Sequence, residues 1–187
     1  MNLSGVLLAG GESLRMGSDK ALLTFGREPL WQHQLGILRE IQSELILISA
    51  RSDPAWRPVD CEFVQDESPS RGPLSGLAAS LAQISTPHLL VLAIDMPFMS
   101  AKYLHGLSQG LLAGQGIVPI VEGRAEPLAA IYPKEALSEV FQALAGEDFS
   151  MQSLIRQLVQ SDKLRTVAVE DHERKYFRNL NAPVDLS

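Results

Sequence analysis

Apolar segments with the length of strands alternate with segments of helical periodicity along most of the chain. The strand-like runs are continuously apolar, and the clearest of them is HLLVLAI at residues 88–94. Such runs are typical of parallel strands that are covered by helices on both faces of a sheet. Strands are expected at residues 4–9, 44–50, 62–64, 88–94, 116–121, 127–132 and 164–169, and helices at residues 30–41, 73–84, 101–112, 133–144 and 150–159. The pattern predicts an α/β fold with helices on both faces of the sheet.

A single domain covering residues 1–187 is expected, because this length suits one sizeable core and no repeat or linker-like stretch interrupts it. The N-terminus lacks the basic start and long apolar run of a secretory signal, and no apolar run is long enough to span a membrane. Cys61 is the only cysteine, so an internal disulfide is excluded and a reducing compartment is the default. We therefore expect a cytoplasmic protein without a membrane partner.

The charge balance narrows the class of ligand. The formal net charge is −6, which argues against the broad cationic surface that nucleic-acid binding requires. A small anionic ligand is compatible with this charge, because a local cluster of cations can hold it. The histidines lack the spacing of metal ligands, so packing or surface roles are favoured over a zinc site; they are His33, His88, His105 and His172.

A glycine-rich, cationic segment follows the first expected strand, since residues 7–23 read LLAGGESLRMGSDKALL. Gly10 and Gly11 allow the backbone to turn sharply, so that successive N–H groups can face an anion. Arg15 and Lys20 can add charge-assisted hydrogen bonds to phosphate oxygens. The spacing fits neither the P-loop nor the dinucleotide-binding pattern. A generic glycine turn with surface cations is the alternative, but the position of the cations after a first strand favours a triphosphate site.

Two aspartates follow expected strands. Asp95 stands where the apolar strand at residues 88–94 ends, and α/β sheets bind ligands at the carboxyl ends of their strands. Mg²⁺ prefers a few carboxylates together with phosphate oxygens and water, so we favour Asp95 as a metal ligand over a mere turn before Pro97. For Asp66, contact with a nucleotide and a turn cap stay equally open.

These residues together resemble the molybdenum cofactor guanylyltransferase family, a branch of the nucleotidyltransferases. The opening motif of that family, LAGGxSxRMGxDKxLL, matches residues 8–23. Further similar segments are GREPLWQ at 26–32, GPLSGL at 72–77, DMP at 95–97, EPLAAIY at 126–132 and NLNAPVDL at 179–186. The similarity covers nearly the whole chain. It implies a three-layer, Rossmann-like, mostly parallel sheet of the nucleotide-diphospho-sugar transferase type.

The resemblance also implies a reaction, the transfer of GMP from GTP to the phosphate of the molybdenum-molybdopterin cofactor, with release of pyrophosphate and with Mg²⁺ as the metal. Gly11, the second glycine of the pair, is similar to the guanine-using branch, because related cytidylyltransferases read LAAG at this point. Metal contact carries over to Asp95. Nucleotide contact carries over to Leu8, Ala9, Gly10, Gly11, Lys20, Asp66 and Asp95.

Some positions depart from the family pattern. Where the family often has Asn-x-Asn, this chain has Ser49, Ala50 and Arg51, so Arg51 either replaces an amide contact with the nucleotide or leaves it out. Ala182 stands in place of the usual Thr of the final motif, and residues 146–153 (GEDFSMQS) are more acidic than in many relatives. The sequence therefore leaves open how the pterin phosphate is held.

The expected catalytic residues are Arg15, Lys20 and Asp95. The attacking phosphate is already anionic, so catalysis is expected to come from positioning and from neutralisation of charge rather than from a strong base. Arg15 and Lys20 would hold the triphosphate, and Mg²⁺ on Asp95 would act as template and Lewis acid. The alternatives are a cytidylyltransferase acting on a pterin or another phosphorylated acceptor, and a non-catalytic nucleotide-binding adaptor. Molybdoenzymes or their chaperones are the candidate protein partners.

Overall fold

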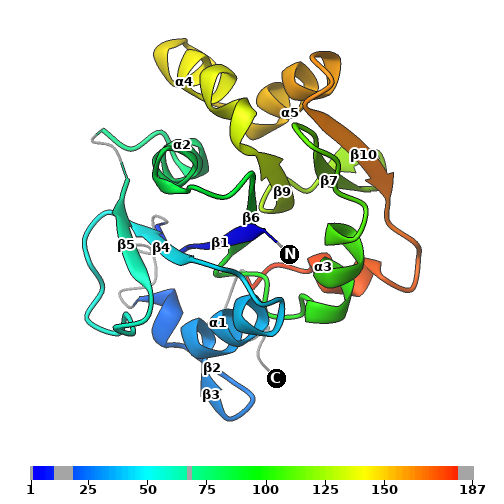
Figure 1. Ribbon diagram of the computed structural model, residues 1–187. Coiled ribbons are helices and arrows are strands. Elements are labelled where there is room, and N and C mark those ends of the chain that lie inside the picture. Colours follow the sequence, from blue (N-terminus) through cyan, green and yellow to red (C-terminus); the bar gives the residue numbers. More distant parts are fainter. Residues whose placement is uncertain (1, 11–18, 67–68, 181–187) are drawn as a thin grey trace.

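The computed structural model describes residues 2–10, 19–66 and 69–180 and shows the strands gathered in a central sheet (Figure 1). The eight-stranded sheet has the order β10-β7-β9-β6-β1-β4-β5, and β8 pairs with β7. All neighbouring strands are parallel except β9, which is antiparallel to β6 and β7, and β8, which is antiparallel to β7. The strands are β1 (Leu3–Leu8), β4 (Ile46–Ala50), β5 (Glu62–Gln65), β6 (His88–Ala93), β7 (Gly116–Val121), β8 (Arg124–Ala125), β9 (Ala129–Pro133) and β10 (Leu164–Ala168).

Helices cover both faces of this sheet, which confirms the predicted three-layer fold (Figure 1). Successive side chains of a strand point to opposite faces, so the buried strands feed two separate apolar cores. Leu7 and Leu90 belong to the core beneath α1 and α3, whereas Val6 and Val91 belong to the core beneath α2, α4 and α5. The helices are α1 (Leu30–Glu40), α2 (Pro73–Gln83), α3 (Ala101–Ser108), α4 (Leu137–Ala145) and α5 (Met151–Gln160).

The ends of the helices follow from local sequence signals. Pro29 precedes α1, and Pro73 occupies the first turn of α2 after Gly72, whose positive φ of 66° suits glycine. Ser100 caps α3, because its Oγ accepts a 3.3 Å hydrogen bond from the N–H of Tyr103. The glycine, proline and serine signals therefore place these helices as the sequence predicts.

Several boundaries differ from the prediction. The helix expected over residues 101–112 ends at Ser108, and the chain then turns past Gly110, whose carbonyl accepts a 2.7 Å hydrogen bond from Arg165 of β10. The segment expected to be helical from residue 133 begins as the 3₁₀ helix η3 (Lys134–Ala136), and α4 starts only at Leu137. The short hairpin β2 (Thr24–Phe25) and β3 (Glu28–Pro29), the strand β8 and the 3₁₀ helices η2 (Lys20–Leu22) and η4 (Arg174–Phe177) were not predicted. Two- to four-residue elements carry too little periodicity to be recognised.

Among the described residues, no helix has both the length and the apolar character that crossing a lipid bilayer requires.

Candidate active site

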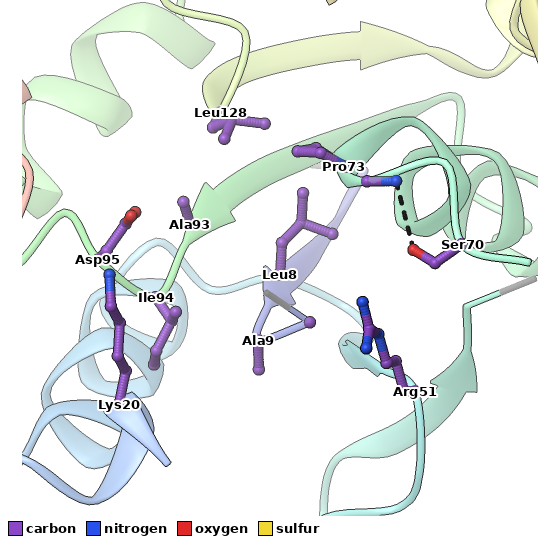
Figure 2. Close-up of a pocket in the computed structure, with 12 residues that line it drawn as sticks. Leu8, Ala9, Lys20, Arg51, Ser70, Pro73, Ala93, Ile94, Asp95 and Leu128 are labelled. Atoms are coloured by element: carbon purple, nitrogen blue, oxygen red, sulfur yellow. Dashed lines mark hydrogen bonds between the residues drawn. The ribbon is translucent and has the colours of Figure 1, made fainter. Parts of the chain in front are cut away.

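A cavity of about 410 Å³ opens at the carboxyl ends of β1, β4 and β6 (Figure 2). This is the edge at which parallel α/β sheets place their ligands. Five of the residues predicted to bind a nucleotide line it, namely Leu8, Ala9, Gly10, Lys20 and Asp95. The remaining lining residues are Arg51, Ser70, Gly72, Pro73, Ala93, Ile94 and Leu128. The structure therefore brings the glycine turn and the aspartate after β6 to one cavity.

The turn after β1 is held by the neighbouring strand β4. The N–H groups of Ala9 and Gly10 both donate to the carbonyl of Ser49, at 2.9 Å and 3.1 Å. A Cβ atom at Gly10 would overlap the carboxylate of Asp66, so glycine is required here for close packing rather than for an unusual φ angle. Gly11 and Arg15, predicted to continue this turn, lie outside the described residues.

Asp95 follows β6 and is held in place through its neighbours. The N–H of Ile94 donates to the carbonyl of Leu8 at 3.1 Å, and the buried side chain of Gln34 donates from Nε2 to the carbonyl of Ala93 at 3.2 Å. Burial raises the pKa of Asp95, while the charge of Lys20 and a backbone hydrogen bond act in the opposite direction. A partly buried carboxylate beside one cation is suited to a further positive ligand, because such a ligand compensates for the water that burial removes.

Lys20 is the first residue of the 3₁₀ helix η2, and its side chain extends toward Asp95 (Figure 2). Its Nζ atom donates a 3.2 Å hydrogen bond to the carbonyl of Leu180. The N–H of the same Leu180 donates to the backbone carbonyl of Asp95 at 2.7 Å. Leu180 therefore fixes Lys20 relative to Asp95 through both of its backbone polar groups.

Asp66 lies behind the glycine turn and is not among the residues that line the cavity. Its side chain is 7% exposed and accepts a hydrogen bond from the hydroxyl of Ser49. Burial raises the pKa of Asp66, and the Ser49 hydrogen bond and the charge of Arg51 oppose that shift. Asp66 is thus placed to hold Ser49 and the turn at Gly10 from the inside of the protein.

The prediction from sequence did not assign six of the lining residues to the site, namely Ser70, Gly72, Pro73, Ala93, Ile94 and Leu128. Ser70 lies in the loop before α2, Pro73 is the first residue of α2, and Leu128 lies in the loop before β9 (Figure 2). The N–H of Gly72 donates to Ser70 Oγ at 3.3 Å and closes the loop before α2 into a turn. The family-like segments GPLSGL and EPLAAIY were the available signals for Pro73 and Leu128.

The described residues contain no group of three or more His, Cys, Asp or Glu side chains arranged to hold a metal ion. Mg²⁺ does not require such a group, because it is commonly held by one or two carboxylates, water and the phosphate oxygens of a substrate. Asp95 provides a carboxylate at the wall of a cavity that also receives Lys20 and the turn at Gly10. This donor set fits a magnesium ion that enters with a polyphosphate.

Comparisons of the sequence with known proteins indicate one family. The family described as "MobA-like NTP transferase domain" matches residues 5–164. A "Probable molybdenum cofactor guanylyltransferase" from Opitutus terrae is 39% identical over 186 residues, covering 98% of this chain and 92% of that protein.

Solved structures support the fold. The crystal structure of molybdopterin-guanine dinucleotide biosynthesis protein A from Archaeoglobus fulgidus has a TM-score of 0.73 at 24% identity and covers 98% of this chain and 94% of its own. The crystal structure of 4-diphosphocytidyl-2C-methyl-D-erythritol synthase from Anaerococcus prevotii has a TM-score of 0.75 at 13% identity. It covers 98% of this chain and 92% of its own. At these identities the structures show a common fold, and it is the sequence matches that indicate the family.

Proposed function

The chain belongs to the family of MobA-like NTP transferase domains, and from this we propose that it is a molybdenum cofactor guanylyltransferase that works as a single domain over residues 1–187. It is an enzyme of the nucleotidyltransferase class. It transfers GMP from GTP to the phosphate of molybdenum-molybdopterin and releases pyrophosphate. The resemblance found in the sequence is confirmed by the relatives that carry this name.

One observation carries the proposal for the site: Lys20 and Asp95, which come from distant parts of the chain, line the same cavity as the turn that follows β1. A cavity with backbone N–H groups, a cation and a carboxylate can bind a polyphosphate together with a divalent ion. We assign nucleotide binding to Leu8, Ala9, Gly10 and Lys20. The sequence motif adds Gly11 and Arg15 to the same loop.

The metal is proposed to be Mg²⁺, with Asp95 as its protein ligand. When bound, the ion would supply Lewis-acid stabilisation of charge on phosphate oxygens. Asp66 has a different part in this proposal. It supports Gly10 and Ser49 from behind the turn, so that the nucleotide contact implied for it by the family acts through the backbone.

Catalysis by this chain is a matter of placement and charge. The attacking phosphate is anionic near neutral pH, so no group needs to remove a proton from it before attack. Lys20 stabilises the negative charge that develops toward the leaving pyrophosphate, and Leu180 holds the Lys20 ammonium in position. Leu8 and Ala93 add apolar side chains to the lining of the cavity. Orienting two polyanions in this way replaces the covalent catalysis that other transferases use.

Two other functions make different predictions. A cytidylyltransferase would have the same fold, as the structure of 2-C-methyl-D-erythritol 4-phosphate cytidylyltransferase from Thermus thermophilus illustrates with a TM-score of 0.66, but the sequence relatives carry the guanylyltransferase name. A nucleotide-binding adaptor would have no need of the catalytic groups Lys20 and Asp95. We also propose a cytoplasmic location, where GTP is available, and delivery of the product to molybdoenzymes or their chaperones.

The test is incubation of the protein with Mg²⁺, molybdenum-molybdopterin and each of the four nucleoside triphosphates in turn, followed by mass analysis of the products. We expect pyrophosphate and a guanine dinucleotide of the cofactor with GTP only. A product that forms faster with CTP would establish the cytidylyltransferase instead. Tight binding of GTP without any product would establish the adaptor.

A further inference from the structure

Trp56 lies in the loop that joins β4 to β5 and makes a contact that the proposed mechanism does not use. Its indole Nε1 donates a 2.8 Å hydrogen bond to Oδ2 of Asp19. The indole ring stacks on that of Trp31 in α1, with ring centroids 5.5 Å apart and an interplanar angle of 18°. A half-buried tryptophan clamped by a second ring has a fixed N–H direction, so this hydrogen bond is held in place from the tryptophan side.

The other oxygen of Asp19 organises the start of η2. Asp19 Oδ1 accepts a 3.0 Å hydrogen bond from the N–H of Ala21, which makes Asp19 the N-cap of this short helix. Its two carboxylate oxygens thus serve different partners, the indole of Trp56 and the first turn of η2. The residue between the cap and Ala21 is Lys20.

Lys20 is consequently held at both ends. Its backbone lies in the turn that Asp19 caps, and its Nζ atom donates to the carbonyl of Leu180. Ala21 is 1% exposed and packs η2 into the core, but a buried methyl group does not set the direction of the neighbouring side chain. The capping carboxylate of Asp19 does set the direction of the Lys20 side chain, because it fixes the backbone to which that side chain is attached.

We propose that Trp56 is a positioning residue for Lys20, and that it acts through Asp19. The loop of Trp56 starts at Arg51, which lines the nucleotide cavity, so a single loop contacts the cavity at one point and controls its lysine at another. The inference rests on the proposed role of Lys20 as a phosphate-binding group. It adds an element that the family motif, which ends at residue 23, does not contain.

The test compares Trp56→Phe with Trp31→Phe. Trp56→Phe removes the N–H donor and keeps an aromatic ring on Trp31, whereas Trp31→Phe alters the same stacked pair and keeps the hydrogen bond to Asp19. The chain has two tryptophans, so each variant also has a single indole whose fluorescence reports on that pair. Asp19→Asn is the second variant, because it keeps the shape of the cap but places an amide opposite the indole. Thermal unfolding verifies that all three variants are folded.

The first measurement needs no nucleotide. The rate at which Lys20 reacts with an amine-modifying reagent, followed by peptide mass spectrometry, reports how firmly its ammonium is held. We expect modification to become several-fold faster in Trp56→Phe and Asp19→Asn, and to stay at the wild-type rate in Trp31→Phe. An unchanged rate in Trp56→Phe, or an equal increase in Trp31→Phe, would overturn the proposal.

The second measurement is GTP-dependent pyrophosphate release in a double-mutant cycle. A lost hydrogen bond to a charged group predicts that Trp56→Phe lowers kcat/KM by roughly tenfold. If Trp56 acts through Lys20, this loss disappears when Lys20 is already alanine. An equal loss in both backgrounds would refute the inference. Absence of turnover in the wild-type protein would refute the proposed function instead, and the modification rate would still decide the role of Trp56.

Discussion

The carbonyl of Leu180 accepts a 3.2 Å hydrogen bond from Nζ of Lys20, across 160 positions of sequence. The same residue donates its N–H to the carbonyl of Asp95 at 2.7 Å. The segment after η4 therefore joins the start of η2 to the residues that follow β6. Hydrogen bonds between segments this far apart form only in the complete fold, so the correct spacing of the two charged groups depends on the C-terminal part of the chain.

Replacement of Lys20 by alanine is expected to lower GTP-dependent turnover by about 100-fold, because it removes a cation from the proposed triphosphate site. The fold should survive, since the side chain is only partly buried and bonds a single backbone carbonyl. Pyrophosphate release and thermal unfolding measure the two effects. Lys102→Ala, at an exposed position of α3, is the matched control and should leave turnover unchanged. Near-normal pyrophosphate release by Lys20→Ala would contradict the proposed role.

Replacement of Asp95 by asparagine tests the proposed role of its carboxylate as a metal ligand. We expect a loss of turnover of about 100-fold or more, because the amide keeps the shape but cannot balance a divalent cation. Stability at neutral pH should be equal or higher, because burial raises the pKa of Asp95 and its ionised form is therefore costly without a ligand. Asp171→Asn is a control, because the side chain of Asp171 is 90% exposed. A variant that is inactive only because it is unfolded would show a lowered melting temperature, contrary to this expectation.

Gly10→Ala should damage the site through packing. The new Cβ would overlap the carboxylate of Asp66, and overpacking of this kind costs about 1–3 kcal/mol in the free energy of unfolding. Gly36→Ala is a matched control in α1, where an added Cβ meets no atom within 4 Å and should stabilise the helix by about 0.5–1 kcal/mol. Urea denaturation measures both changes. We expect the free energy of unfolding to fall in Gly10→Ala and to rise in Gly36→Ala. Equal changes in the two variants would show that the close approach of Asp66 to Gly10 is unimportant.

The sequence predicted the parts of the site that belong to regular elements. Continuous apolar runs located β1 and β6 to within one residue at each end, and the rule that ligands bind at carboxyl ends then placed Leu8 and Asp95 at the same cavity. The position of Asp66 was not predictable. Its carboxylate is directed at Gly10 by the packing of three parallel strands, and no local signal distinguishes such a residue from one that faces the ligand.

Contacts between loops are the second feature of the structure that could not be predicted from the sequence. Trp56 meets Asp19 across 37 positions, and α3 ends early where Arg165 reaches Gly110 from 55 positions away. Contacts of this kind depend on how loops of different elements meet, and periodicity contains no information about them. The charged and polar residues could be named from the sequence, but their partners could not.

Arg51 lines the cavity, at a position where the resemblance to the family leads us to expect asparagine. If it replaces an amide contact with the nucleotide, Arg51→Ala should raise the KM for GTP by roughly tenfold, whereas Arg51→Asn should restore most of the affinity. Arg51→Lys separates charge from shape, because lysine cannot offer the planar fork of donors that arginine has. Steady-state kinetics with GTP and with CTP measures both affinity and base preference. Equal KM values in all variants would show that Arg51 makes no contact with the nucleotide.

The buried carboxyl of Asp66 predicts a specific dependence of stability on pH. Burial raises its pKa in the folded protein, so between the unfolded and the folded pKa the folded state binds more protons than the unfolded state. The free energy of unfolding therefore falls as the pH rises from about 4 through the folded pKa, and this contribution is constant above it. Asp66→Asn removes the titration while its carbonyl can still accept the hydrogen bond from Ser49. In urea denaturation between about pH 4 and about pH 8, the variant should gain stability relative to the wild type as the pH rises. Parallel curves would mean that Asp66 titrates alike in both states, and its assignment as a buried support of the glycine turn would then be wrong.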